Sequence, residues 1–238
     1  MIRAAKIIAD FNRGTMMNIL VTGGAGYIGS HTCVELLNAG HNVIALDNFS
    51  NASPVALARV MEITNKPLVV VEADIRDPDA LDKVFNEHAI DAVMHFAGLK
   101  AVGESTKMPL TYYDNNVNGT RVLLTVMAEN DVNCLVFSSS ATVYGDPDSV
   151  PIDECFPLRT TNPYGQTKLV VEQMCREVAK ANKRLSVILL RYFNAVGAHP
   201  SGLIGEDPKG VPNNLMPFIA QVAVGKRKQL SVFGNDYD

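Results

Sequence analysis

The feature that most constrains the fold is a run of glycines directly after an apolar segment. Residues 18–21 read Asn-Ile-Leu-Val, and Gly23, Gly26 and Gly29 follow. A strand that turns sharply into a helix needs residues without a Cβ at such positions. The free N–H groups at the start of the helix can then face a pyrophosphate. The pattern therefore predicts a strand, a glycine turn and a helix that together bind a dinucleotide, with an ordinary tight turn as the structural alternative.

A second apolar strand, predicted at 42–46, ends at Asp47. This offset from the glycine turn, roughly 20 residues, is typical of the carboxylate that binds the ribose hydroxyls of a dinucleotide. A carboxylate repels a 2′-phosphate, and the next residue is Asn48 rather than an arginine. We therefore predict NAD rather than NADP as the cofactor. The alternative for Asp47 is a role in a turn or at a helix N-terminus.

Beyond this point the chain alternates between continuous apolar runs and helical patterns. Strands are predicted at 68–71, 92–96, 134–137 and 186–190, and helices at 54–64, 79–88, 109–130 and 163–182. Continuous hydrophobicity indicates strands that are covered on both faces, so we predict an α/β fold with a Rossmann-type, doubly wound parallel sheet. Residues 17–193 form this NAD-binding domain, 194–238 begin a smaller substrate lobe, and 1–16 are an N-terminal extension.

Composition narrows the function. The 238 residues are 47% hydrophobic and 19% charged, which is typical of a soluble globular protein. A net charge of −4 with one short basic run at 226–228 argues against a nucleic-acid partner. No apolar stretch is long enough to span a bilayer, so no membrane role is expected. The four cysteines form no C-x-x-C pair, which predicts a reducing cytoplasm and no metal site. We interpret His95 as a packed residue rather than a ligand.

Small or polar residues follow each predicted strand. In a parallel sheet the carboxyl ends of all strands meet at one edge, where ligands bind close to the point at which the strand order reverses. One crevice is therefore expected to collect these residues. They are Gly23, Asp47, Asp74, Ala97 with Gly98, the serines at 138–140, and the stretch 191–194.

Tyr164 and Lys168 lie four residues apart in the predicted helix 163–182, and this spacing places them on one helical face. A free phenol has a pKa of about 10 and is a poor base near neutrality. We expect the ammonium, together with the positive charge of the oxidised nicotinamide, to lower that pKa. Lys168 can also bind the nicotinamide ribose, and Ser140 can donate to the same substrate oxygen. We predict Ser140, Tyr164 and Lys168 as the catalytic residues; such a pair on an ordinary surface helix is the alternative.

Through the glycine loop and Tyr164-x-x-x-Lys168, the chain resembles the extended short-chain dehydrogenase/reductase superfamily. More narrowly, it resembles the UDP-glucose 4-epimerase family, and the match runs from residue 17 to the last residue. The stretches that carry this narrower resemblance are 23–32, 95–105, 112–120, 138–145, 190–194 and 212–217.

The resemblance implies an isomerase that interconverts UDP-galactose and UDP-glucose, as in galactose metabolism. The implied reaction proceeds through a 4-keto sugar, and NAD stays bound to the enzyme throughout. A cytoplasmic homodimer that packs the helices 109–130 and 163–182 is also implied. The implied cofactor residues, besides the glycines, are Tyr27, Ile28, Asp47, Asn48, Asp74, Ile75, Phe96, Ala97, Gly98, Lys100, Asn115, Tyr164, Lys168 and Phe193. The implied UDP-sugar residues are Ser140, Tyr164, Asn194, Asn214, Ser231, Val232 and Phe233.

Other interpretations stay open. A nucleotide-sugar 4,6-dehydratase is disfavoured, because the dehydratases carry Thr-Asp-Glu where this chain has Ser140-Ala141-Thr142, and neither Ala141 nor Thr142 moves a proton at neutral pH. Epimerases for other UDP-sugars differ in the size of the pocket, which the sequence does not reveal. A third interpretation is a binding protein without turnover. The chain stops after an apparent strand near 231–233, whereas the family continues, so we expect NAD binding with severely reduced turnover.

Overall fold

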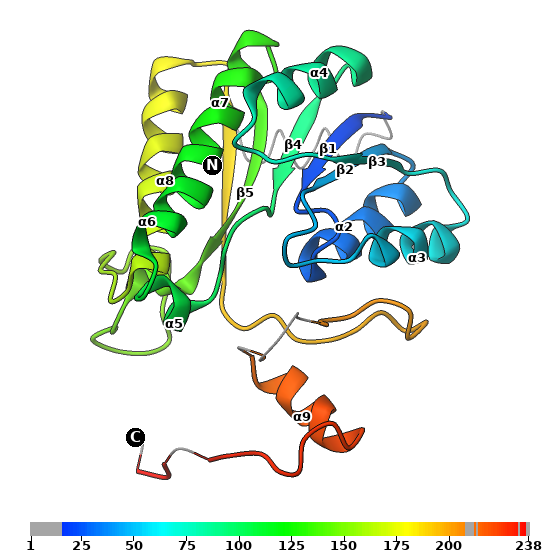
Figure 1. The fold of residues 1–238 in the computed structure, drawn as a ribbon. Helices are drawn as coiled ribbons and strands as arrows, with labels where there is room; N and C mark the ends of the chain where they lie inside the picture. Colours follow the sequence, from blue (N-terminus) through cyan, green and yellow to red (C-terminus); the bar gives the residue numbers. More distant parts are fainter. Residues whose placement is uncertain (1–15, 208–211, 213, 233, 237–238) are drawn as a thin grey trace.

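The computed structural model describes residues 16–207, 212, 214–232 and 234–236. Its centre is a six-stranded sheet in the order β3-β2-β1-β4-β5-β6, and every neighbouring pair is parallel (Figure 1). The order reverses between β1 and β4, which confirms the predicted doubly wound α/β fold. The strands are β1 (Asn18–Thr22), β2 (Asn42–Asp47), β3 (Val69–Glu72), β4 (Ala92–His95), β5 (Cys134–Ser140) and β6 (Ser186–Tyr192).

Helices cover both faces of the sheet, with α2 and α3 on one side and α4, α7 and α8 on the other (Figure 1). The predicted helix 109–130 is divided, because a π-helical segment separates α6 from α7. The helical segments are α2 (Tyr27–Asn38), α3 (Pro54–Thr64), α4 (Pro78–His88), α5 (Val102–Ser105), α6 (Pro109–Tyr112), the π-helix η1 (Tyr113–Asn118), α7 (Gly119–Glu129), the 3₁₀ turn η2 (Ala141–Tyr144), α8 (Pro163–Ala181) and α9 (Leu215–Ala223).

Local sequence determines where the main helices begin. The helices α3, α4 and α8 each start with a proline, whose fixed φ suits the first turn and whose missing N–H needs no partner there. The preceding residue is Ser53, Asp77 or Asn162, and its side chain accepts a hydrogen bond from a first-turn N–H group. The start of α8, and with it the position of Tyr164, is therefore specified by its own residues.

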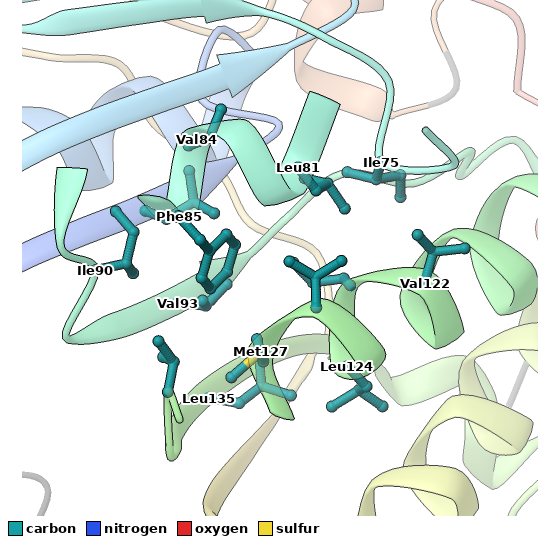
Figure 2. Packing of buried hydrophobic residues seen from close by; sticks show 14 of the residues in the cluster. Ile75, Leu81, Val84, Phe85, Ile90, Val93, Val122, Leu124, Met127 and Leu135 are labelled. Atoms are coloured by element: carbon teal, nitrogen blue, oxygen red, sulfur yellow. The ribbon is translucent and has the colours of Figure 1, made fainter. Parts of the chain in front are cut away.

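The sheet separates two hydrophobic cores. Successive side chains of a strand point to opposite faces, so Ile19 and Val21 pack towards α2 and α3, whereas Leu20 packs towards α4 and α7. Figure 2 shows the second core, in which residues of α4, β4 and α7 interdigitate. Burial on both faces explains why the strands read as continuous apolar runs.

Two features near the carboxyl end differ from the sequence prediction. The apparent strand near 231–233 is wrong for Ser231 and Val232, which belong to neither a strand nor a helix, and Phe233 lies outside the described residues. The helix α9 was not predicted, although its first residues, 215–217, lie within a stretch that carried the family resemblance. None of the helices in the described part of the chain is long and apolar enough to cross a membrane.

Candidate active site

The glycine loop lies at the reversal point of the sheet, where it packs tightly against the loop after β4. Gly23 has a φ of +68°, and a Cβ there would lie 2.6 Å from the backbone nitrogen of Ala97. A Cβ on Gly29 would collide with the carbonyl oxygen of Gly23. These two positions therefore need glycine for backbone geometry and close approach, as predicted.

The start of α2 suits an anionic ligand. Gly26 is the N-cap of α2, and no side chain in the described part of the chain caps it. A Cβ on Gly26 would meet only the carbonyl oxygen of Gly23, at 3.2 Å. The first-turn N–H groups and the positive end of the helix dipole are thus approachable by a pyrophosphate. The loop fits the diphosphate of NAD, and Tyr27 and Ile28 are the first residues of this helix.

Asp47 is buried at the end of β2, directly against the glycine loop. One carboxylate oxygen accepts a hydrogen bond from the Ala25 N–H at 3.0 Å, and the other accepts from the Phe49 N–H at 2.9 Å. Asp47 therefore stabilises a turn, as the structural alternative predicted. It also fixes a negative charge beside the phosphate-binding loop, where the ribose of the cofactor is expected.

The predicted cofactor residues Asn48 and Asp74 are brought together at the ends of β2 and β3. The Asn48 amide donates to the Asp74 carboxylate at 3.0 Å, and Arg76 forms ion pairs with Asp74 at 2.8 Å and with Asp114 at 2.7 Å. Hydrogen bonds from Arg76 hold the pKa of Asp74 well below its usual range, although burial opposes them. Arg76 was not among the predicted site residues. The predicted cofactor residue Ile75, next to it in sequence, is buried in the hydrophobic core.

The loop after β4 passes beside the predicted catalytic lysine. A Cβ on Gly98 would lie 3.6 Å from Nζ of Lys168, so the backbone of this loop runs past the ammonium. Phe96 and Ala97 are half-buried at the start of the same loop. The structure thus places three predicted cofactor residues between the glycine loop and α8.

Asn116, in the π-helix, holds this arrangement together, and sequence reasoning missed it. Its side chain accepts from the Leu99 N–H at 2.8 Å and donates to the Leu99 carbonyl and the Thr167 hydroxyl, both at 3.0 Å. The predicted residue Asn115 donates to the same side chain at 3.0 Å. Asn116 therefore connects the loop after β4 to α8 one residue before Lys168.

The three serines that end β5 each interact with the same face of α8. The Lys168 ammonium donates to the backbone carbonyl of Ser138 at 2.7 Å, and the Ser139 hydroxyl donates to Glu172 at 2.5 Å. The Ser140 hydroxyl lies close enough to Tyr164 to lower the pKa of the phenol in part, and it accepts hydrogen bonds from the N–H and the hydroxyl of Thr142 at 3.2 and 2.9 Å. Residues 164, 168 and 172 lie one helical turn apart, so a single helix face meets consecutive residues of one strand. The predicted group Ser140, Tyr164 and Lys168 is assembled at the carboxyl edge of the sheet.

The predicted lowering of the Tyr164 pKa requires the oxidised nicotinamide as well as Lys168, and the chain alone shows only what its own residues do. Burial raises the pKa of Tyr164, and the hydrogen bond with Ser140 lowers it only in part. Burial also lowers the pKa of Lys168 to about 8. The Lys168 nitrogen lies 6.0 Å from the centre of the Tyr164 ring. Removal from water therefore determines the direction of both shifts, and Lys168 alone does not lower the pKa of the phenol.

The predicted cofactor residue Phe193 and the predicted UDP-sugar residues beyond β6 are more dispersed. Phe193 is 62% exposed, and Asn194, Ser231 and Val232 are exposed as well. Within the described residues none of these four forms a hydrogen bond with Ser140, Tyr164 or Lys168, and Phe233 cannot be placed. A pocket of about 520 Å³ runs along β6, but its lining includes neither Tyr164 nor Lys168.

The segment after β6 returns across the carboxyl edge of the sheet. The Tyr27 hydroxyl donates to the Gly197 carbonyl at 2.7 Å, and Ile204 is buried in the core beside α2 and α3. Glu206 then accepts hydrogen bonds from Lys100 at 3.0 Å and from Asn214 at 2.6 Å. A predicted cofactor residue and a predicted UDP residue thus share one carboxylate, which sequence reasoning did not identify.

His95 is fully buried, and both of its ring nitrogens have hydroxyl partners, so its interpretation as a packed residue is confirmed. In the described part of the chain, no cluster of three histidine, cysteine or acidic side chains could hold a metal ion. The phenol of Tyr164, at this edge of the sheet, is a group that can transfer a proton.

Comparison with known proteins agrees with this geometry. The model of the NAD dependent epimerase/dehydratase family matches residues 19–237. A UDP-glucose 4-epimerase of Bacillus subtilis is 65% identical over 221 residues, which cover 93% of this chain and 65% of that protein. This chain thus spans just under two thirds of the length of that relative.

Two solved structures are similar in both sequence and shape. The UDP-glucose 4-epimerase of Bifidobacterium longum, in complex with NAD⁺ and UDP, is 56% identical with a TM-score of 0.90, covering 93% of this chain and 66% of that one. The enzyme of Stenotrophomonas maltophila, with bound NAD and formylated UDP-arabinopyranose, is 53% identical with a TM-score of 0.90 over the same shares. From the match over residues 19–237, the parallel sheet and the glycine loop, we conclude that the chain belongs to the NAD dependent epimerase/dehydratase family.

Proposed function

We propose that this chain carries the NAD site and the catalytic group of a UDP-glucose 4-epimerase, an isomerase that interconverts UDP-galactose and UDP-glucose. One observation carries the proposal. Tyr164, whose pKa is lowered in part by the neighbouring Ser140, shares a helix face with the buried Lys168, and the Lys168 ammonium lies beside the loop that packs on the phosphate-binding glycines. The similarity to UDP-glucose 4-epimerases solved with NAD supports the same function.

The cofactor NAD would be held along the edge formed by β1, β2, β3 and β4. The first turn of α2 would bind the diphosphate, and Asp47 would bind the ribose and reject a 2′-phosphate. When bound, NAD supplies a reversible acceptor for the hydride at C4 of the sugar. The remaining cofactor contacts that we propose are Asn48, Asp74, Ile75, Phe96, Ala97, Gly98, Lys100, Asn115 and Phe193.

Residues of this chain would remove and return the proton of the sugar C4 hydroxyl. Tyr164 would accept the proton of the C4 hydroxyl and later return it to the same oxygen, while Ser140 orients that oxygen by a hydrogen bond. Lys168, with a pKa of about 8, is mostly protonated at neutral pH and can donate to the nicotinamide ribose. Since burial raises the pKa of Tyr164, the phenolate needs a positive charge beyond Lys168, which the oxidised cofactor carries.

We further propose that residues 17–193 form the NAD-binding unit and that 194–238 begin the substrate lobe. In this lobe Asn194, Asn214 and the stretch 231–233 would hold the UDP portion. A homodimer through α7 and α8 and a cytoplasmic location complete the proposal. The four cysteines, all within the described residues, form no disulfide, which supports a reducing compartment. The exposed side chains of Met108 and Leu110, at the start of α6, support a contact between copies.

The test is to assay conversion of UDP-galactose to UDP-glucose without added cofactor, comparing the chain with its Tyr164→Phe variant. We expect slow conversion by the chain and at least a ~100-fold lower rate for the variant, because general acid–base catalysis contributes at least that much. Equal rates in the two proteins would contradict the role of Tyr164. Bound NAD without conversion would instead indicate a binding unit that lacks part of its substrate lobe.

A further inference from the structure

A chain of hydrogen bonds crosses the interior of the protein at the point where the strand order reverses. His95, at the end of β4, is 1% exposed. Its Nδ1 lies 2.6 Å from the hydroxyl oxygen of Thr22 on β1, and its Nε2 lies 2.9 Å from that of Thr120 on α7. The proposed function assigns no role to these three residues.

The position of each proton in this chain follows from counting donors. The Thr120 hydroxyl donates to the backbone carbonyl of Asn116 at 2.6 Å, one turn earlier in the helix. A hydroxyl has a single proton, so the oxygen of Thr120 can only accept from His95, and Nε2 must carry a hydrogen. In a neutral ring Nδ1 is then unprotonated, and it accepts a hydrogen bond from the Thr22 hydroxyl. The Thr22 oxygen in turn accepts from the N–H of Ala97 at 3.4 Å.

The surroundings keep the ring neutral. The imidazole is packed against Phe137, with ring centres 5.7 Å apart, and the buried ammonium of Lys168 acts on it as a like charge. Burial and, to a lesser extent, that like charge lower the pKa of His95 to about 3. The ring is thus neutral at neutral pH, so each hydrogen bond between Thr22, His95 and Thr120 has a fixed donor and a fixed acceptor.

We propose that His95 is a positioning residue, locked as the neutral Nε2–H tautomer, which connects the loop after β4 to the π-helix of the NAD site. One end of this series of hydrogen bonds is the backbone N–H of Ala97, and Gly23 packs against that nitrogen. The other end is the carbonyl of Asn116, whose side chain holds Leu99 and α8. The role rests on the proposed NAD function, whereas the tautomer does not.

The tautomer is tested by nitrogen-15 NMR of the chain with labelled histidine, without any cofactor. The His95 signals are those lost in His95→Asn. We expect Nε2 to have the chemical shift of a protonated nitrogen and Nδ1 that of an unprotonated one. A ring protonated at Nδ1, or at both nitrogens near neutral pH, would overturn the assignment.

The positioning role is tested with Thr120→Val, which keeps the shape of the side chain but neither accepts from His95 nor donates to Asn116. We expect NAD to bind about tenfold more weakly, as for a buried histidine donor left without its partner. Thr120→Ser should restore the affinity to within about twofold. Thr125→Val is the matched control: its hydroxyl makes the same contact to the carbonyl one turn earlier in α7, but on the surface. Its affinity should be unchanged.

Each outcome bears on one part of the inference. NAD affinity in Thr120→Val equal to that of the unmodified chain would refute the positioning role. If the unmodified chain bound no NAD, the proposed function would fail. The positioning role would then be decided by hydrogen exchange of the Leu99 N–H. Thr120→Val should accelerate that exchange at least about tenfold, and Thr125→Val should leave it unchanged. A melting temperature for each variant shows whether it is folded under the conditions of the assay.

Discussion

Removal of the Glu172 carboxylate should destabilise the fold more than any change on the surface of the same helix. The Glu172 side chain is fully buried, and it accepts hydrogen bonds from Ser139 at 2.5 Å, from Arg191 at 2.9 and 2.7 Å, and from Arg176 at 2.7 Å. The Arg191 side chain is only 12% exposed. In Glu172→Ala, the guanidinium of Arg191 would stay largely buried without its carboxylate partner, with the Tyr144 hydroxyl at 2.8 Å as a remaining acceptor. Loss of one member of a buried ion pair costs about 3–5 kcal/mol.

That loss is large, because a folded domain has a free energy of unfolding of about 5–15 kcal/mol. Urea denaturation followed by circular dichroism at pH 7 measures it, and an unchanged m-value shows that the two-state comparison holds. Glu177→Ala, at an exposed position of α8, is the control and should change the stability by less than about 0.5 kcal/mol. The double variant Glu172→Met with Arg191→Met should recover much of the loss, since no buried charge is left unpaired.

The pH dependence gives the same prediction an independent check. Burial raises the pKa of Glu172, but the hydrogen bonds from Arg191, Ser139 and Arg176 outweigh it, and the net pKa is lowered. A carboxylate with a lowered folded pKa stabilises fully above its unfolded pKa of about 4.3 and loses that contribution as pH falls through the folded value. The gap between the chain and Glu172→Gln should therefore narrow below about pH 4. A loss under about 1 kcal/mol in Glu172→Ala at pH 7 would refute the reasoning.

Three further predictions concern the proposed NAD site. Lys168→Met should raise the free energy of unfolding at pH 7 by about 1–3 kcal/mol, because burial lowers the pKa of Lys168 to about 8 from an unfolded value of about 10.4. Between those two pKa values the unfolded chain binds more protons than the folded chain, so the stability of the unmodified chain rises with pH and the advantage of Lys168→Met should shrink. Denaturation at pH 7 and at pH 9.5 measures the stability difference and its change with pH. A variant less stable than the unmodified chain would contradict the argument. Gly29→Ala should cost about 1–3 kcal/mol and abolish NAD binding in calorimetry, since its Cβ collides with the Gly23 carbonyl; unchanged binding would show that the loop can relax. Asp47→Asn should raise the affinity for NADP relative to NAD by about tenfold, because the charge that repels a 2′-phosphate is removed. An unchanged ratio of the two dissociation constants would exclude Asp47 from the ribose site.

The sequence predicted well whatever depends on periodicity and local signals. The strands 92–96 and 186–190 were recognised because four of the five residues in each are apolar, and the carboxyl edge followed from the parallel order. The start of α8 was predictable because Asn162 and Pro163 are local signals for a helix N-terminus.

Interactions between distant residues were not predictable in the same way. Ser139 and Glu172 are 33 residues apart, and the two ends of the Asn116–Thr167 hydrogen bond are 51 apart. Nothing in their local sequence distinguishes them from surface polar residues. The effect of burial on Tyr164 and Lys168 was not predictable for a related reason, because their spacing reveals a shared helix face but not the burial that dominates both pKa values.

The central claim is that the edge formed by the glycine loop, Asp47 and the loop after β4 binds NAD. The most direct measurement is to unfold the purified chain in denaturant and quantify the released dinucleotide by chromatography, alongside titration of the emptied, refolded chain with NAD and NADP. The account predicts saturable binding of one NAD per chain, with NADP bound much more weakly. Absence of NAD from the purified chain together with no binding in the titration, or equal affinity for NADP, would contradict it.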